Sequence, residues 1–317
     1  MNPNILVCGD VMLDKYIWGE ADRLSPEAPV PVIEVSRTSH VLGGAANVAN
    51  NVVHLGARCE LFGVIGDDAD GQVVLEELMS NSITPQVVTD PARLTTSKTR
   101  IIARGQQIAR LDVECREEIS NYTVDSLLEA FRSAARHAQT CVISDYNKGV
   151  ISSRVAGSII QHCRSLGVPV IVDPKGRSCD RYRGATLIKP NRHEASQLVG
   201  RPLCSRDDIV QAGFELVQSF DGADVLITLG AEGMALFRAG CEAEFFATEV
   251  HKVFDVTGAG DTVLAAFAVF IAHGREITEC VRYANAAASL AVAKMGTSVI
   301  TEAELEAASV FSTSAHA

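Results

Sequence analysis

The sequence predicts an α/β fold that combines a mostly parallel central sheet with a small antiparallel β-lid. Short apolar runs alternate with longer helical patterns along the 317 residues, which is typical of a parallel sheet covered by helices on both faces. Two half-polar segments, residues 30–36 and 96–112, do not fit such a buried sheet. We therefore expect one domain over residues 1–317, with a lid formed by about residues 14–38 and 96–112 that stands off from the main body.

The expected strands of the main body are short and apolar, as strands buried on both faces are. They comprise residues 5–9, 59–65, 141–144, 168–172, 186–189 and 224–228. Residues 235–238 and 244–250 are expected to add antiparallel strands to this sheet. Residues 96–103 and 106–112 alternate polar and apolar around an Arg-Gly pair, which predicts a hairpin in the lid.

Helices are expected between these strands. They comprise residues 44–55, 70–79, 122–137 and 153–166, two helices between residues 189 and 224, and three that begin at Gly260, Glu276 and Glu302. The small polar residues at the end of the chain are expected to fray.

Composition limits the classes of function. Hydrophobic residues make up 47% and charged residues 21% of the chain, so it can bury a full core. The formal net charge of −11 repels polyphosphate, so we expect no nucleic-acid partner, although a local basic pocket for a small phosphate stays compatible with it. No apolar run reaches the roughly 20 residues needed to span a bilayer, and no signal peptide is recognisable. The nine cysteines are scattered without a C-x-x-C spacing, which favours a reducing compartment. We expect a cytoplasmic protein without a membrane partner.

Residues 257–262 read TGAGDT and stand directly before a long apolar run. Gly258, Ala259 and Gly260 leave backbone N–H groups unscreened, and a helix that begins near Gly260 adds its unpaired donors and its positive dipole end. Such a turn can bind an anion. Asp261 would lie in the first helical turn as an ionised proton acceptor, and phosphoryl transfer needs both features. The alternative is an ordinary helix cap, which is the commoner meaning of an isolated G-x-G-D.

Polar residues after the expected strands are candidates for substrate binding, because α/β sheets bind ligands at the carboxyl ends of their strands. Asp10, Asp14 and Asp145 occupy such positions, and each could instead cap a helix or lie in a loop. Another candidate is the turn Gly43-Gly44, which could let a polyol approach the backbone and precedes Asn47, an amide with donor and acceptor groups. The alternative is an ordinary start of a helix.

The lid carries candidates for binding a substrate phosphate. Lys98, Arg100 and Arg104 fall on one face at the period of a strand, and three cations that face a cleft could bind a phosphate group. Lys175, which follows another strand, is a further candidate. The alternative is an edge strand guarded by charge.

A second set of candidates suits a nucleotide. Asn191 and Glu194 follow a strand and could hold Mg²⁺ through waters, but N-x-x-E is also a variant of a capping box. Thr228, Gly230 and Gly233 end another strand in a glycine turn suited to phosphate or ribose. The Walker pattern, the dinucleotide fingerprint and H-E-x-x-H are all absent from the sequence.

Three of these motifs together resemble the ribokinase-type (phosphofructokinase-B) carbohydrate kinases, over about residues 4–310. The motifs are the glycine pair with Asn47, the N-x-x-E at residues 191–194, and DVTGAGDT at residues 255–262. The resemblance implies a ribokinase-like three-layer α/β/α fold, with ATP and Mg²⁺ as phosphoryl donor and metal. It also implies that Asp261 takes the hydroxyl proton and that the helix around Asn285 lines the nucleotide side. Members of this family commonly form homodimers through their lid sheets.

Four further stretches resemble a subgroup of this family, the heptose 7-phosphate kinases of lipopolysaccharide core synthesis. They are residues 9–14 (GDVMLD), 24–32 (LSPEAPVPV), 106–112 (QQIARLD) and 144–149 (SDYNKG). This resemblance implies phosphorylation of D-glycero-β-D-manno-heptose 7-phosphate at its C1 hydroxyl. Lys98, Arg104 and Lys175 would then bind the 7-phosphate. No H-x-G-H motif of an adenylyltransferase occurs, so a stand-alone kinase is expected.

Other readings of the sequence remain open. A kinase for another sugar phosphate, a free sugar or a nucleoside would keep the same chemistry. A non-catalytic sugar-phosphate sensor on the same fold would not need to keep Asp261 and its glycines.

Overall fold

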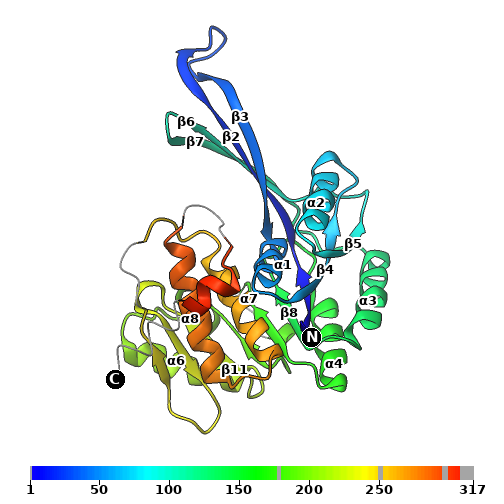
Figure 1. Cartoon of the computed structure of the whole chain (residues 1–317), viewed down its shortest axis with the longest axis vertical. Coiled ribbons are helices and arrows are strands. Elements are labelled where there is room, and N and C mark those ends of the chain that lie inside the picture. The colour runs from blue at the N-terminus through cyan, green and yellow to red at the C-terminus, as the bar shows by residue number, and fades with distance from the viewer. Residues whose placement is uncertain (1, 177–179, 249–252, 295–298, 308–317) are drawn as a thin grey trace.

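The computed structural model describes residues 2–176, 180–248, 253–294 and 299–307, and it confirms the predicted fold class. A nine-stranded sheet carries helices on both faces, and a four-stranded sheet projects from this body (Figure 1).

The large sheet is parallel except at one edge. Its strands, in spatial order, are β13 (Glu244–Phe246), β12 (Met234–Phe237), β11 (Asp224–Thr228), β10 (Leu187–Ile188), β9 (Val170–Asp173), β8 (Thr140–Ser144), β1 (Asn4–Gly9), β4 (Arg58–Ile65) and β5 (Thr84–Thr89). Strands β12 and β13 pair antiparallel, as predicted. The carboxyl ends of the parallel strands therefore meet at one edge of the sheet.

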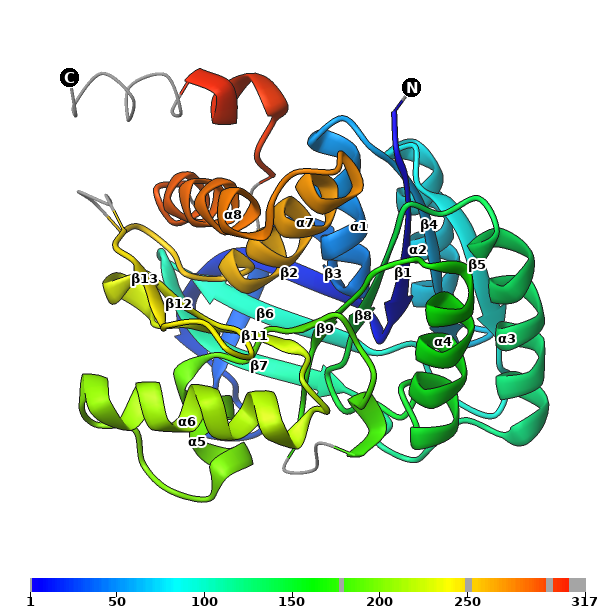
Figure 2. The ribbon, with the colours of Figure 1, turned by 90° about the horizontal axis from the view of Figure 1, so that it is seen from below.

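Helices cover both faces of this sheet (Figure 2). One face packs against α1 (Ala45–His54), α2 (Ala69–Ser80), α7 (Ala259–Ala272) and α8 (Ile277–Val292). The other packs against α3 (Asn121–Ala135), α4 (Ser153–Leu166), α5 (Arg192–Val199) and α6 (Arg206–Ser219). Short 3₁₀ turns, η1 (Asp180–Tyr182) and η2 (Gly230–Glu232), lie in loops, and residues 302–307 are helical. Within the described ranges, no helix is long and apolar enough to cross a membrane.

The lid is larger than predicted and is not wholly antiparallel. Its strands, in spatial order, are β3 (Pro31–Gly44), β2 (Val11–Leu24), β6 (Ser97–Ala103) and β7 (Gln106–Val113). The outer pairs are antiparallel, but β2 and β6 in the middle pair in parallel. The reason is the path of the chain, which returns to the body through β3 and later leaves it again through β6 in the direction of β2.

Sequence reasoning did not assign two strands. Strand β5 contains Pro85 and partly exposed polar residues, and it lies at the edge of the sheet, where proline is tolerated. Strand β2 carries charged residues and Gly19 along its half-exposed length, so it lacks the apolar signal of a buried strand. The predicted strand at residues 244–250 ends beyond the described residues, as does the polar tail.

Candidate active site

Asp261 lies at the start of α7, where the predicted glycine turn occurs. Gly258 is the N-cap residue of this helix, with φ 78° and ψ −2°, a left-handed conformation that glycine adopts without strain. The next residues, Ala259 and Gly260, form the first helical turn with Asp261. The Ala259 N–H donates to the Val256 carbonyl at 3.3 Å, whereas the N–H groups of Gly260 and Asp261 have no acceptor within the helix. They therefore form an anion-binding end of the helix beside a carboxylate.

The carboxylate of Asp261 is buried and accepts two hydrogen bonds. Asn47 Nδ2 donates to its Oδ2 at 2.7 Å, and the Tyr146 hydroxyl donates to its Oδ1 at 2.6 Å. Burial raises the pKa of Asp261, while the bonds from Tyr146 and Asn47 lower it. Each oxygen of an ionised carboxylate can accept a further hydrogen bond, so Asp261 can also accept from a substrate hydroxyl.

A buried cation lies beside the same helical turn. The Lys189 ammonium is 3.0 Å from Asp173 Oδ1, and a Cβ placed on Gly260 would lie 3.8 Å from this ammonium. Burial lowers the pKa of Lys189, but the carboxylates of Asp173 and Glu194 raise it by more, so Lys189 stays charged. Positive charge is thus added to the end of α7 at which an anion would bind.

The base of the lid faces Asp261. The charge of Asp14 raises the pKa of Asp261, and Asp14 Oδ1 accepts from Arg100 Nη1 at 2.5 Å. Strand β2 places Asp14 in register with Lys98 of β6, so their side chains share this face. A Cβ on Gly43 would lie only 2.6 Å from Asp14 Oδ2. Glycine at this position therefore leaves room for the carboxylate.

Gly44 is the second residue of the predicted glycine pair. Its φ is 57°, and a Cβ there would lie 2.4 Å from the Asp10 carbonyl oxygen. The pair thus serves the tight passage from β3 into α1, which brings Asn47 to Asp261.

The prediction that Arg104 shares this face with Lys98 is wrong. Strand β6 ends at Ala103, and Arg104 has φ 50° in the turn that follows. The Arg104 side chain is exposed and pairs with Asp22 and Glu20 at the far end of the lid. The alternation of side chains along β6 therefore ends at Ala103, and it does not fix the direction of the Arg104 side chain.

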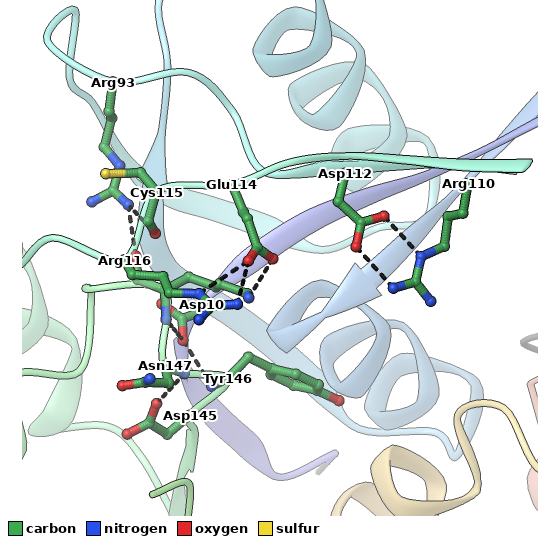
Figure 3. A network of polar contacts seen from close by, with 11 residues as sticks. Asp10, Arg93, Arg110, Asp112, Glu114, Cys115, Arg116, Asp145, Tyr146 and Asn147 are labelled. Atoms are coloured by element: carbon green, nitrogen blue, oxygen red, sulfur yellow. Dashed lines mark hydrogen bonds and ion pairs between the residues drawn. The ribbon is translucent and has the colours of Figure 1, made fainter.

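Asp145 does not point at the substrate face. Its carboxylate accepts from the Tyr182 hydroxyl at 2.5 Å and from the Asn147 amide at 2.6 Å, and it pairs with Arg181. Figure 3 shows Asp145 and Tyr146 pointing in different directions from one loop. The alternative of a loop-stabilising residue is therefore the one that the contacts of Asp145 favour.

Lys175, Asn191 and Glu194 form a cluster at the start of α5, next to Lys189 and Asp173. Asn191 and Glu194 make a full capping box at the start of α5, which confirms that alternative for the N-x-x-E motif. Glu194 Oε1 also accepts from Lys175 Nζ at 2.6 Å. Lys175 is thereby brought to the cap of α5 rather than to the lid.

The donor atoms of this cluster decide whether it can hold magnesium. Asn191 and Glu194 offer oxygen atoms, which magnesium prefers, but Lys175 and the capping box already engage both Glu194 oxygens. Among the described residues, no three His, Cys, Asp or Glu side chains are arranged to hold a metal. The residues fit Mg²⁺ bound through waters and substrate phosphates, and they do not fit a cage of protein ligands alone.

The remaining nucleotide candidates lie next to this cluster or on α8. Thr228 ends β11 and bridges to Asn191 of the neighbouring strand end. Gly230 has φ 64° in η2, and a Cβ on Gly233 would lie 1.9 Å from the Phe246 carbonyl oxygen. Asn285 Nδ2 donates to the Ala247 carbonyl at 2.7 Å. Gly233 thus allows the close approach of the backbone at Phe246, and Asn285 fixes the backbone at Ala247.

Sequence reasoning did not name Tyr146 or Lys189 as site residues, and it left Arg100 out of the final set. A lysine at the end of a buried strand was a usable signal for Lys189, because a buried charge needs a partner. Arg100 was on the predicted lid face. For Tyr146 the signals were its place after a strand and the stretch SDYNKG at residues 144–149, and neither assigned it a role.

The fold and site define a class of protein. A parallel sheet with an anion-binding helix start, a buried carboxylate beside it and a lid over the strand ends is the arrangement of a ribokinase-like sugar kinase. A family profile described as pfkB family carbohydrate kinase matches residues 2–304. The chain belongs to this family, whose enzymes are phosphotransferases with an alcohol group as acceptor.

The sequence is also similar to curated proteins. The chain is 41% identical over 303 residues to the bifunctional protein HldE of Geobacter sulfurreducens and 42% identical over 306 residues to that of Nitratiruptor sp.. These alignments cover 95% and 96% of this chain but only 62% and 65% of the relatives. The chain thus spans less than two thirds of the length of either protein.

Solved structures share the fold. The chain is similar to Arabidopsis thaliana ribokinase in complex with ribose and ATP, with a TM-score of 0.77, 25% identity, and coverage of 97% of this chain and 99% of that one. It is also similar to phosphofructokinase-2 of Escherichia coli, with a TM-score of 0.81, 20% identity and 98% coverage of both chains.

Proposed function

We propose that the protein is an ATP-dependent kinase that phosphorylates D-glycero-β-D-manno-heptose 7-phosphate at its C1 hydroxyl, giving heptose 1,7-bisphosphate for lipopolysaccharide core synthesis. The observation that carries this proposal is the buried carboxylate of Asp261 at the anion-binding start of α7. The four stretches that resemble heptose 7-phosphate kinases support this sugar, and so does the identity to the HldE proteins.

Asp261 acts as the general base in this proposal. It accepts the proton of the C1 hydroxyl while the oxygen forms a bond to the γ-phosphorus of ATP, and the bond to the bridging oxygen breaks to release ADP. The amides of Gly258, Ala259 and Gly260 stabilise the negative charge on the transferring group. The charged Lys189 beside Gly260 adds to that stabilisation.

The substrate would lie between α7 and the base of the lid. Asp14, Asn47 and the backbone of Gly43-Gly44 would bind sugar hydroxyls. We assign the 7-phosphate to Lys98 and Arg100, because β6 presents both on the face that carries Asp14.

The nucleotide would lie over the ends of β10 and β11. Thr228, Gly230 and Gly233 would contact it, with Asn285 on the helix behind. Asn191 and Glu194 would hold Mg²⁺ through waters, and the ion would supply positive charge to the phosphate oxygens. The ATP complex of the Arabidopsis ribokinase supports ATP as the donor.

Two copies of the chain would pair through the lid. The lid exposes apolar side chains that a monomer leaves in water, namely Leu24, Val35, Ile108 and Leu111. Burial of such side chains in an interface is favourable.

The test is ADP release from ATP and Mg²⁺ with a panel of acceptors. The panel contains heptose 7-phosphate, fructose 6-phosphate, fructose, ribose and adenosine. We expect strong turnover with heptose 7-phosphate only. Turnover with a different acceptor would discard the heptose assignment and keep the kinase. Folded protein that binds ATP and turns over none of them would point to the sensor.

A further inference from the structure

We propose that Tyr146 is a positioning residue for the phosphoryl-transfer reaction, which orients the carboxylate of Asp261 and keeps it ionised. The proposal rests on the proposed function, because it takes Asp261 as the general base. It assigns Tyr146 a role through Asp261 and no contact with the reacting atoms.

The loop that carries Tyr146 is fixed at the carboxyl end of the sheet. It follows β8, and Asp10 at the end of β1 accepts three of its backbone amides. The amide of Tyr146 lies 2.7 Å from the Asp10 carboxylate (Figure 3). The amides of Lys148 and Val150 lie at 3.1 Å and 3.2 Å from it. A loop tied at three points holds the Tyr146 ring in one place, and the ring points away from Asp145.

The hydroxyl of Tyr146 is placed to donate to the base. It lies 2.6 Å from Asp261 Oδ1, a short distance for a neutral donor and typical of a bond to an ionised oxygen. Asn47 holds the other oxygen. The two donors from α1 and the β8 loop thus fix the plane of the carboxylate, and both oxygens keep a lone pair for the substrate hydroxyl.

The charged groups around Asp261 act on its pKa in opposite directions, so the hydrogen bond from the Tyr146 hydroxyl contributes substantially to keeping the carboxylate ionised. Lys189 at the end of β10 faces the carboxylate and lowers the pKa of Asp261, whereas Asp14 from β2 raises it. Asp173 at the end of β9 also interacts with Asp261 and is paired with Lys189. Arg100 pairs with Asp14, and Lys189 is shared between Asp173 and Asp261. The hydrogen bonds from Tyr146 and Asn47 therefore supply much of the stabilisation of the ionised Asp261 carboxylate. Tyr146 itself remains protonated, because burial raises its pKa well above the usual value.

The test is Tyr146→Phe, which removes one oxygen atom and keeps the ring. Without the donor the pKa of Asp261 rises, and the base is ionised only at higher pH. We expect the acid limb of kcat/KM for heptose 7-phosphate to move up by about 1–2 pH units. The KM for ATP should stay within a factor of about two, because the ring keeps its place.

Tyr182→Phe is the matched control. Tyr182 is fully buried and also donates to a carboxylate, at 2.5 Å from Asp145 Oδ2, but Asp145 is not the base. We expect this variant to leave the acid limb where it is in the wild type, whatever it does to the rate. An equal shift in both variants would overturn the proposal, because it would show a general effect of removing a buried hydroxyl.

A second variant changes the donor without removing it. Site-specific 3-fluorotyrosine at position 146 has a more acidic hydroxyl, which donates more strongly and stabilises the ionised carboxylate. The acid limb should then move to lower pH, opposite to the shift in Tyr146→Phe. A shift to higher pH in this variant would contradict the proposal, and the variant keeps the test available if Tyr146→Phe fails to fold.

A readout without turnover separates this inference from the proposed function. The side-chain carboxyl of Asp261 can be titrated by ¹³C NMR in protein labelled at aspartate, with Asp261→Asn to identify its resonance. The titration midpoint should be higher in Tyr146→Phe than in the wild type and Tyr182→Phe. An unchanged midpoint would overturn the inference even if the kinase is active. A raised midpoint in a protein that phosphorylates no acceptor would refute the proposed function and leave the coupling of Tyr146 to Asp261 intact.

Discussion

At the scale of single residues, the site is built around a carboxylate that is costly to bury. Asp261 is 5% exposed, and hydrogen bonds from Asn47 and Tyr146 offset part of the cost of removing its charge from water. A buried carboxylate at the start of a core helix can accept a proton, which is the role proposed for Asp261. Asn47 and Tyr146, which stabilise the charge of Asp261, also fix the orientation of its carboxylate.

Asp261→Asn should keep the fold and lose activity. Asparagine has the same shape and can still accept from Asn47, but it cannot take a proton from a hydroxyl. We expect kcat to fall by roughly 10²–10⁴-fold, with a thermal unfolding curve close to that of the wild type. Near-normal turnover in the folded variant would remove Asp261 from its role.

The activity should depend on pH through Asp261. A base works only when deprotonated, so kcat/KM falls as pH drops through its pKa. Burial raises that pKa above the usual value of an aspartate, so the acid limb should lie higher than that of an ordinary aspartate. A pH profile of the wild type measures it. An acid limb at or below the ordinary aspartate value would contradict the burial of an ionised base.

The sequence indicated Asp261 but not Tyr146, and the reason is physical. The TGAGDT turn and the apolar run after it are local, so a helix start with a first-turn carboxylate could be predicted from neighbouring residues. The direction of the Tyr146 ring depends on Asp10, which is 136 residues away. Tertiary contacts of this kind leave no local pattern.

At the scale of elements, glycines act where the backbone of one element approaches another. Gly233 has φ 91°, and a Cβ there would lie 1.9 Å from the Phe246 carbonyl of β13. Gly157, in the middle of α4, has no atom within 4 Å of such a Cβ. The two glycines should therefore respond in opposite ways to the same substitution.

Gly233→Ala should lower the free energy of unfolding by about 1–3 kcal/mol, because the backbone or β13 must move. Gly157→Ala is its control and should raise it by about 0.4–1 kcal/mol, since alanine restricts the unfolded chain and fits the helix. Denaturant titrations measure both. Equal losses in the two variants would show that the close approach at Gly233 is not what matters.

The strands of the lid divide its cations into two groups. Lys98 lies on the substrate face near Asp14, whereas Arg104 pairs with Asp22 at the far end of the lid. Lys98→Ala should raise the KM for the sugar phosphate by about 10-fold or more, the loss of one charge-assisted bond, with little change for ATP. Arg104→Ala is the matched control and should leave both KM values near those of the wild type. Steady-state kinetics with each substrate varied in turn measure both KM values. Equal effects of the two variants would contradict the assignment of Lys98 to the substrate phosphate.

Elements with a strong apolar pattern were predictable and those without one were not. The helix at residues 153–166 and the strand at residues 224–228 have the bounds that were predicted from sequence. Strand β2 was missed because its outer end is exposed and carries the charged residues Glu20, Asp22 and Arg23.

At the scale of the whole molecule, the lid projects from the body (Figure 1). Apolar side chains on it, among them Leu24, Val35 and Leu111, are exposed in the single chain. The parallel pairing of β2 with β6 could not be read from sequence, because it depends on how the chain returns to the lid after α1, β4, α2 and β5. The mostly parallel character of the main sheet followed more directly from the alternation of strands and helices.

The proposed homodimer makes a prediction at this scale. Leu111→Asp places a charge among the exposed apolar residues of the lid, so the protein should change from dimer to monomer in light scattering. Tyr122→Asp is the control, because Tyr122 is exposed on α3 of the body, 80% accessible. A wild-type monomer, or an equal effect of both variants, would contradict pairing through the lid.

The central claim is that Asp261 and the start of α7 transfer a phosphoryl group to the C1 hydroxyl of heptose 7-phosphate. The most direct measurement is phosphorus NMR of the product formed from this sugar with ATP and Mg²⁺. The account predicts a new phosphate resonance coupled to the anomeric proton in the wild type and none with Asp261→Asn. A phosphate on another carbon, or the same product from Asp261→Asn at a similar rate, would contradict it.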